Sequence, residues 1–399
     1  MRILGLFLNE RAHTGGHLRY LELLRGLAAR GHRVTLVTGL RTQLSDALLV
    51  MHRDASTSFD VLRITVEAPL FSLRPRVSLS HLWLRSVSRS EDSVLRQSGL
   101  PEVVCVFGEN KAVAGARLAA AAGCPLVVGL RSNMKAELDV LGTHRSPMIL
   151  APLLGAIEAR VLESRERRVA EAASRVIFQT DFDRDDFLQR HPEVGGKTAV
   201  IPNNLEPSWF DPIRRDTNTS TGVRHLVFVG TLNRRKGVLT LLEAVRRLVH
   251  EEGYDIRLKV LGTGPLRGAV TNMVRSYRLE ETVDLLGQRE DSLETIARSD
   301  LLVLPSLFDS FPNVLLEALH VGTPAVATRV GGIPEILGAD GELVNPGDAA
   351  ALTAAVRRLI DDPTAYERAK ASMIDRRQAF EFDWVGRFEN AIREAVEGG

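Results

Sequence analysis

The sequence predicts an α/β protein built from two doubly wound, Rossmann-like parallel-sheet domains. Short β-branched and aliphatic runs alternate with amphipathic stretches along the chain, which is typical of βαβ units with helices on both faces of a sheet. The length of 399 residues exceeds what one hydrophobic core usually supports. A polar, turn-rich stretch at 214–222 separates two such alternations. We therefore expect two domains that face each other across a cleft.

The first domain is predicted to span residues 1–206, followed by a hinge at 207–222. Its opening strand is RILGLFL, which leads to the helix LRYLELLRGLAARG and the strand HRVTLVT. The strand EVVCVFG, the helix AVAGARLAAAAG and the strand PLVVGL follow later. RVIFQTD and TAVIPNN are expected to be the last strands of this domain.

The second domain is predicted to span residues 223–381. The strand LVFVG is followed by a helix after Lys236, and the strands IRLKVLGTG, TVDLLG, SDLLVLPS and TPAVATR alternate with further helices. A helix begins near Ala349, and FDWVGRFENAIREAVEGG, at about 382–399, forms a last amphipathic helix. Periodicity alone does not say which domain this last helix joins.

Composition excludes several classes of protein. With 44% apolar residues, 25% charged residues and a formal net charge of +1, the chain is not a disordered tail or a general nucleic-acid binder. No run approaches the roughly 18 apolar residues of a membrane span. Cys105 and Cys124 occur in or beside strand-like runs, so we expect them to be packing residues in a reducing, cytoplasmic compartment.

The stretch DSFPNVLLEAL, which begins at Asp309, predicts an anion site at a helix start. Pro312 at the first helical position has no N–H to leave unpaired, while its neighbours keep free donors. Asn313 and Glu317 share one helix face, so Glu317 is placed to accept hydrogen bonds from a ribose diol and Asp309 from a sugar hydroxyl. Alternatively, Asp309 or Ser310 caps the helix and Glu317 points into water.

A basic cluster follows the first strand of the second domain. In VGTLNRRKGV, Gly230 frees the backbone, and Arg234, Arg235 and Lys236 bring cations to a helix entrance. Cations beside free N–H groups suit a diphosphate. The alternative is a solvated basic turn.

Two pairs of glycines also follow strands. Gly262 and Gly264 lie in LGTGPL, and Gly15 and Gly16 stand between the first strand and the first helix. Either pair permits the backbone to approach a nucleotide, phosphate or substrate closely. Taken alone, Gly262 and Gly264 are better explained by a tight turn without a ligand, whereas such a turn explains Gly15 and Gly16 equally well.

The segment 71–90 carries four arginines, no acid and a tryptophan among leucines. This composition suits an anionic membrane surface or a phosphate-bearing acceptor. The alternative is a solvated face over a local apolar cluster.

The segment TDFDRDDF contains Asp-x-Asp, a spacing that can hold a divalent cation against a diphosphate. We prefer the interpretation that Thr180 caps a helix whose first turn carries Asp181 and Asp183.

Together these motifs resemble the retaining GT-B glycosyltransferases of family 4, the glycosyl transferases group 1. The resemblance covers nearly the whole chain and rests on the order of its motifs: Gly15-Gly16, ASRVIFQTDFDRDD, VIPNNLEPSWF, VGTLNRRKG, LGTGP, LLVLPS and DSFPNVLLEALHVGTPAVATRVGGIPEI. It implies a GT-B fold whose last helix crosses back onto the first domain. It also implies transfer of a hexosyl unit, with N-acetylhexosaminyl as one candidate, from a nucleotide sugar with retention and without a metal or other cofactor.

The acceptor implied is a glycan or a lipid-linked glycan, in surface polysaccharide biosynthesis at the inner face of the membrane. Carried over to this chain, Lys236 holds the diphosphate, Glu317 the ribose and Asp309 a sugar hydroxyl. The expected donor-binding residues are Gly230, Thr231, Arg235, Lys236, Gly262, Gly264, Asp309, Phe311, Pro312, Asn313 and Glu317. The expected acceptor or phosphate side comprises Gly15, Gly16, Arg131 and Asn133, and Lys236, Glu317, Asp309 and Arg131 are the expected catalytic residues.

Three residues depart from the family pattern. Asp309 stands where glutamate is usual, Thr231 where arginine is usual, and Arg131 where many members have histidine. A guanidinium is no base, but it can stabilise developing negative charge.

Other functions are compatible with the same fold. The chain is alternatively a non-catalytic nucleotide-sugar-binding subunit or a hydrolysing epimerase of nucleotide sugars, which nucleotide release and product analysis would distinguish. A nicotinamide dehydrogenase would need a full glycine fingerprint and an acid about twenty residues further on, and neither half has both.

Overall fold

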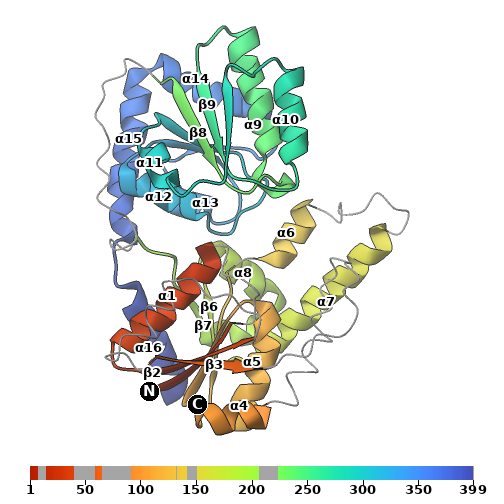
Figure 1. Ribbon diagram of the computed structural model, residues 1–399, viewed down its shortest axis with the longest axis vertical. Helices are drawn as coiled ribbons and strands as arrows, with labels where there is room; N and C mark the ends of the chain where they lie inside the picture. The colour runs from red at the N-terminus through yellow and green to blue at the C-terminus, as the bar shows by residue number, and fades with distance from the viewer. Residues whose placement is uncertain are drawn as a thin grey trace.

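The computed structural model describes residues 1–7, 15–39, 59–64, 91–131, 133–141, 151–205 and 223–398. The predicted hinge and the basic segment 71–90 lie outside these residues. The described chain forms two α/β domains, drawn one above the other in Figure 1. One has a seven-stranded sheet and the other a six-stranded sheet, and all described strand pairs are parallel. The predicted fold class is thus confirmed.

The N-terminal sheet has the order β3-β2-β1-β4-β5-β6-β7. Its strands are β1 (Arg2–Phe7), β2 (Arg33–Gly39), β3 (Phe59–Ile64), β4 (Val103–Phe107), β5 (Leu126–Gly129), β6 (Arg175–Phe178) and β7 (Thr198–Val200). The helices of this domain are α1 (Gly15–Ala29), α4 (Glu91–Ser98), α5 (Glu109–Ala122), α6 (Met134–Leu141), α7 (Ala151–Ala172), α8 (Asp181–Arg190) and the 3-10 helix η1 (Pro192–Lys197). We had not predicted β3, α4, α6 or α7.

The N-terminal sheet is apolar on both faces because it lies between two helical layers. Along β1, Ile3 and Phe7 pack into one core cluster with α1, whereas Leu4 and Leu6 pack into another with α5 and α7. This two-sided burial explains the nearly continuous apolar strands of the sequence.

The C-terminal sheet has the order β10-β9-β8-β11-β12-β13. Its strands are β8 (His225–Val229), β9 (Arg257–Leu261), β10 (Val283–Gly287), β11 (Leu301–Leu304), β12 (Ala325–Thr328) and β13 (Glu342–Val344). Its helices are η3 (Arg234–Lys236), α9 (Val238–Arg246), η4 (Arg247–Glu251), α10 (Arg267–Ser276), α11 (Ser292–Ala297), α12 (Asn313–Val321), α13 (Ile333–Leu337), α14 (Ala349–Asp361), α15 (Pro363–Arg377) and η5 (Gln378–Phe380).

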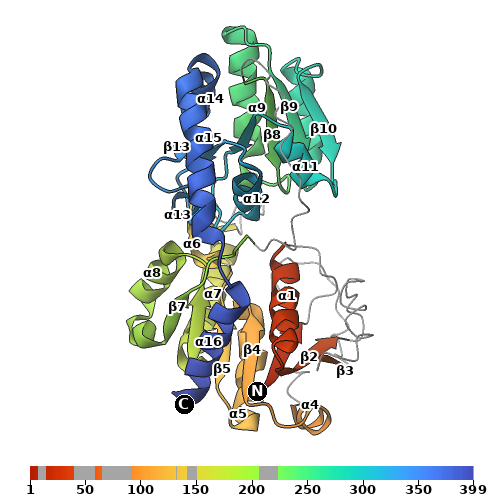
Figure 2. The ribbon, with the colours of Figure 1, turned by 90° about the vertical axis from the view of Figure 1, so that its left-hand side faces the viewer.

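The last helix, α16 (Trp384–Glu397), returns to the N-terminal domain, as predicted. Figure 2 shows α15 beside the C-terminal domain and α16 against the N-terminal one. Trp384, Phe388 and Ile392 are buried in the same cluster as Phe7 and Tyr20. Their burial joins the two ends of the chain in one core.

Both cysteines are free thiols, as expected of packing residues. Cys105 is buried in β4, and Cys124 packs against the core cluster on the other face of the sheet. Among the described helices, none is both long and apolar enough to cross a membrane.

Candidate active site between the two domains

The loops after β8 and β9 pack directly on each other through glycines. A Cβ atom at Gly262 would lie 1.9 Å from the carbonyl oxygen of Gly230, and one at Gly264 would lie 2.5 Å from that of Leu232. Gly262 has a φ of 129°, which side chains rarely adopt. These glycines therefore make the tight turns considered in the sequence, and their approach to a nucleotide stays a prediction.

Lys236 lies at the end of η3, directly after the loop that follows β8. Asn233 Oδ1 accepts a hydrogen bond from the Lys236 backbone N–H at 3.1 Å and so caps this short helix. The Lys236 Nζ atom donates to Asp309 Oδ2, and both side chains are buried. The structure thus brings together the two residues that we had assigned separately to a diphosphate and to a sugar hydroxyl.

The other residues of the basic cluster point elsewhere. Arg234 and Thr231 are exposed. Arg235 Nη1 lies 3.6 Å from Glu137 Oε2 on α6 of the other domain. The Arg235 carbonyl oxygen accepts a hydrogen bond from the Leu307 N–H at 2.7 Å, which fixes the loop after β11. Of the three cations, Lys236 is therefore the one held in the buried interior of the site.

The start of α12 keeps its backbone donors available, as predicted. Pro312 is the N-cap residue rather than the first helical residue, which corrects our prediction by one position. Its ψ of 111° is extended, and its carbonyl oxygen accepts a hydrogen bond from the Leu315 N–H at 3.0 Å. In the described part of the chain, no side chain caps this helix. The alternative in which Asp309 or Ser310 is the cap is therefore wrong.

Glu317 points inward rather than into water. The residue as a whole is half-buried, but its Oε2 atom is buried and has no hydrogen-bond partner among the described residues. Burial raises the pKa of Glu317 to about 7, and the positive charge of Arg19 partly opposes this rise. An unpaired, buried carboxylate oxygen is costly and is suited to accept a ligand hydroxyl.

Arg19 is a site residue that the sequence analysis missed. It lies on α1 and is buried, and it donates to Asn204 Oδ1 at 2.9 Å and to the Asn204 carbonyl oxygen at 2.8 Å. Its guanidinium also lies over the Trp384 ring at 5.8 Å. The pairing of Arg19 with Asn204 spans 185 positions, so no local pattern indicates it.

Asn203 connects the two predicted halves of the site. Its Nδ2 atom donates to Asn313 Oδ1 at 2.7 Å, across the domain boundary. Its Oδ1 atom accepts a hydrogen bond from Arg131 Nη2 at 3.4 Å. Arg131 follows β5 and lies 5.7 Å from the centre of the Phe107 ring, and burial lowers its pKa to about 10. The predicted donor-side and acceptor-side residues thus lie one side chain apart.

Asn133 contributes to the same boundary by capping α6. Its Oδ1 atom accepts from the Ala136 N–H at 2.8 Å, and its own backbone N–H donates to Ser310 Oγ at 3.0 Å. Ser310 Oγ lies 3.3 Å from Asp183 Oδ1 and donates to it. Ser310 is therefore held from both sides by the N-terminal domain.

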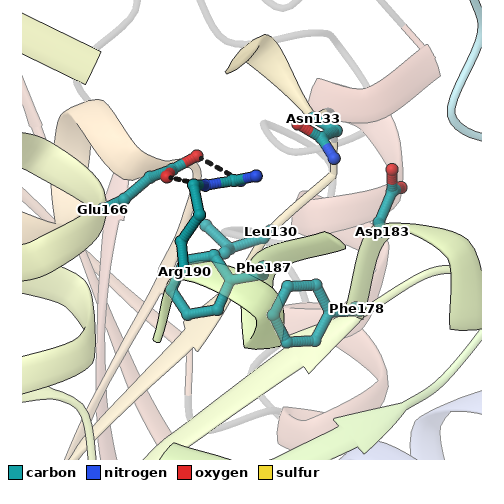
Figure 3. A pocket seen from close by; sticks show the side chains of 7 residues that line it. All are labelled: Leu130, Asn133, Glu166, Phe178, Asp183, Phe187 and Arg190. Atoms are coloured by element: carbon teal, nitrogen blue, oxygen red, sulfur yellow. Dashed lines mark hydrogen bonds and ion pairs between the residues drawn. The ribbon is translucent and has the colours of Figure 1, made fainter. Parts of the chain in front are cut away.

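A small cavity of about 10 Å³ lies behind this contact. Figure 3 shows Asn133 and Asp183 on one side of it and the ion pair of Arg190 with Glu166 on the other. Burial raises the pKa of Asp183 to about 6, although hydrogen bonds from Thr180 and Ser310 oppose the rise. The cavity has room for about one water molecule, so it is not a substrate pocket.

The Asp-x-Asp segment forms a helix N-terminus, as we preferred. Thr180 Oγ1 accepts a hydrogen bond from the Asp183 N–H at 3.1 Å. Glu335 of the other domain accepts from the N–H groups of Asp181, at 2.9 Å, and Phe182, at 2.7 Å. A carboxylate of the C-terminal domain thus caps α8 of the N-terminal domain.

Gly15 and Gly16 open α1, as expected of a helix that follows the first strand. Their predicted contact with phosphate or substrate stays a prediction. The described site therefore offers one buried ammonium, uncapped helix donors and a buried carboxylate on the C-terminal side, facing a guanidinium on the N-terminal side. This arrangement suits a ligand with both anionic groups and hydroxyls.

Two family profiles match almost consecutive parts of the chain. Residues 14–204 match the profile described as "Glycosyl transferase 4-like domain", and residues 223–362 match "Glycosyl transferases group 1". A D-inositol 3-phosphate glycosyltransferase of Pseudarthrobacter chlorophenolicus is 29% identical over 66% of this chain. That alignment covers 63% of the relative's own length.

Solved structures agree with the fold. The sucrose-phosphate synthase of Thermosynechococcus elongatus superimposes with a TM-score of 0.78 at 20% identity and covers 100% of both chains. HepE of Anabaena, solved in complex with UDP and glucose, superimposes with a TM-score of 0.72 at 19% identity, again over 100% of both chains. At these identities, the similarity shows a shared fold.

Proposed function

The chain belongs to the glycosyl transferases group 1, with a glycosyl transferase 4-like N-terminal domain, and on this premise we propose that it is a hexosyltransferase that uses a nucleotide sugar. We propose further that transfer retains the anomeric configuration and needs no metal ion. The acceptor is a glycan or a lipid-linked glycan of surface polysaccharide biosynthesis, glycosylated in the cytoplasm. HepE of Anabaena, which shares the fold, was solved with UDP and glucose, and this supports a nucleotide-sugar donor.

The observation that carries the proposal is the buried ion pair of Lys236 and Asp309 beside the uncapped start of α12. A diphosphate placed there would receive one ammonium and the first N–H groups of the helix. Asp309 holds the ammonium in position and has a second oxygen for a sugar hydroxyl. Glu317 lies one helical turn further on, where its unpaired Oε2 atom would accept a ribose hydroxyl.

Chemically, the glycosidic C1–O bond to the diphosphate breaks and its electron pair leaves with the phosphate oxygen. The acceptor hydroxyl oxygen forms the new bond to C1 on the same face, and its proton passes to the departing phosphate. Negative charge therefore accumulates on the leaving group, where Lys236 and the α12 donors stabilise it. Closing the two domains on each other would exclude water and limit hydrolysis of the donor.

The test is Lys236→Ala, assayed by nucleotide release at saturating donor over a panel of nucleotide sugars and acceptors. Loss of one preorganised cationic donor is expected to lower kcat by about 100-fold or more. Arg234→Ala is the matched control, because Arg234 lies in the same short helix but is exposed. A fall of less than about tenfold, worth about 1.4 kcal/mol, would contradict the proposal.

The same assay separates the rival functions. A non-catalytic subunit would bind a nucleotide sugar, as seen in a thermal shift, but release no nucleotide from any donor. A hydrolysing epimerase would release nucleotide without an acceptor and yield an epimerised free sugar.

A further inference from the structure

A second cation, Lys111, lies beside Arg131 at the carboxyl edge of the N-terminal sheet. Lys111 belongs to the first turn of α5, and its Nζ atom donates to the Phe107 carbonyl oxygen at 3.3 Å. It also lies 5.7 Å from the centre of the Phe7 ring. Arg131 lies over the Phe107 ring of the same strand end. Both cations therefore contact Phe107 at the end of β4, Lys111 at its carbonyl oxygen and Arg131 at its ring.

Keeping two positive charges together in a half-buried place costs free energy. Burial and the charge of Arg131 lower the pKa of Lys111 to about 8. Within the described residues, no carboxylate forms an ion pair with Lys111, whose contacts are a carbonyl oxygen and an aromatic face. An anionic ligand would offset this cost.

The backbone adds to the positive potential at the same place. α5 is 14 residues long and begins immediately after β4, with Gly108 as its N-cap at a φ of 93°. No described side chain accepts a hydrogen bond from its first turn. The Lys111 N–H donates to the Gly108 carbonyl oxygen at 3.1 Å. The N-terminus of a helix nevertheless carries a partial positive charge, which adds to the two side-chain cations.

The cation pair faces the other half of the site. Arg131 donates to Asn203, and Asn203 donates to Asn313 at the first residue of α12. Lys236 belongs to the opposite domain and is paired with Asp309. The molecule thus has one buried cation, Lys236, on the α12 side of the boundary and a pair of cations on the other side, and the diphosphate placed beside α12 uses Lys236.

We propose that Lys111 and Arg131 bind an anionic group of the acceptor, either a phosphate ester or a carboxylate, and so place its hydroxyl opposite the donor sugar. This inference rests on the proposed function, because it names the acceptor class of that same site. It assigns Lys111 as a binding residue of the acceptor and gives Arg131 a partner in that role.

The test uses the full chain saturated with a nucleoside diphosphate chosen by thermal shift from UDP, GDP and ADP, so that the donor side is filled. Calorimetric titration then compares glucose 6-phosphate with glucose, as the phosphate probe and its neutral counterpart, and glycerate with glycerol, as the carboxylate probe and its neutral counterpart. A further arm uses phosphatidylcholine vesicles with and without phosphatidylinositol, which separates a soluble anion from a lipid-linked one. Each titration is repeated on Lys111→Gln and on Lys197→Gln. Lys197 is an exposed lysine at the end of η1, directly before β7, the last strand of the same sheet.

We expect at least one anionic probe to bind the wild type about tenfold or more tightly than its neutral counterpart, the gain expected from a charge-assisted contact. Lys111→Gln should abolish this advantage, and Lys197→Gln should keep it. The inference is overturned if the wild type shows no advantage, if Lys111→Gln keeps it, or if both variants lose it equally. Nucleotide binding is measured first in every variant: failure to bind any diphosphate would count against the proposed function, whereas normal nucleotide binding without anion selectivity would refute only the acceptor class.

Discussion

The carboxyl edge of each sheet, where the strands end and their loops begin, is made of different material in the two domains. In the C-terminal domain the edge is made of backbone in close contact: a Cβ atom at Gly237 would lie 1.8 Å from the Pro305 carbonyl oxygen, and one at Gly331 would lie 2.0 Å from that of Asp309. In the N-terminal domain the corresponding glycine, Gly108, has no described atom within 4 Å of such a Cβ. Side chains form that edge instead, with Lys111 and Arg131 packed on aromatic rings.

This difference fits the two kinds of ligand proposed for the molecule. An edge made of closely packed backbone offers N–H groups whose positions do not depend on side-chain type, and this suits the diphosphate common to nucleotide sugars. An edge made of side chains changes its chemistry with each substitution, and this suits an acceptor that varies between enzymes. We infer that the C-terminal edge fixes the donor class and that the N-terminal edge selects the acceptor.

The largest expected effect concerns the close backbone packing. Gly237→Ala should destabilise the protein by about 3 kcal/mol or more, because the new methyl group meets the Pro305 carbonyl and the residue has a φ of 65°. The matched control is Gly123→Ala, with a φ of 63° but no described atom within 4 Å of its Cβ. It should cost only the conformational strain, about 1 kcal/mol. Urea denaturation followed by circular dichroism measures both, and equal losses would show that the packing difference is irrelevant.

A smaller effect is expected from the unpaired carboxylate of the donor side. The pKa of Glu317 is about 7 in the folded chain against an ordinary value of 4.5. Between these values the folded state binds more protons than the unfolded state, so Glu317 lowers stability progressively as pH rises from about 4.5 to about 7. Glu317→Gln should therefore stabilise the unliganded protein by about 2 kcal/mol at about pH 6, where the loss is partly developed, and have little effect near pH 4.5.

The same variant should weaken nucleotide binding about tenfold, since an amide offers one acceptor oxygen where the carboxylate offers two.

The stability difference between wild type and Glu317→Gln is measured from their melting temperatures across the pH range. Burial also raises the pKa of Asp183, to about 6, but Asp183 is present in both proteins and cancels in the difference. A difference that does not change with pH would contradict the assignment of a raised pKa to Glu317.

Local patterns predicted those parts of the fold and site that local physics controls. The alternation of apolar and amphipathic runs indicated both parallel sheets, and the residue types around Thr180 indicated the cap of α8. Val314, Leu315, Ala318 and Leu319 have the spacing of one helix face, and all four are buried. The position of Pro312 was wrong by one residue, because composition does not fix the dihedral angles at a helix end.

The remaining contacts depend on how the two domains pack, which no local pattern records. The partner of Lys236, Asp309, lies 73 positions away, and Asn204, the partner of Arg19, lies 185 positions away. From the sequence, Lys236 and Asp309 were predicted as two independent ligand contacts, and the pairing of Arg19 with Asn204 was not predicted. Lys111 was likewise missed, because a single lysine at a helix start is common and only the fold places it beside Arg131.

The smallest expected effect concerns Glu335, whose contact with α8 joins the two domains and so holds their carboxyl edges opposite each other. Glu335 accepts two backbone hydrogen bonds at the start of α8, in the other domain. Glu335→Ala should cost about 1 kcal/mol of stability, as for the loss of a helix cap. It should also increase the radius of gyration measured by small-angle X-ray scattering, because the lost contact joins the domains. Asp348→Ala is the matched control, since Asp348 caps α14 within the C-terminal domain. Asp348→Ala should lower stability by a similar free energy without changing the radius of gyration. If both variants change the radius of gyration equally, or if neither does, Glu335 does not hold the two domains in position.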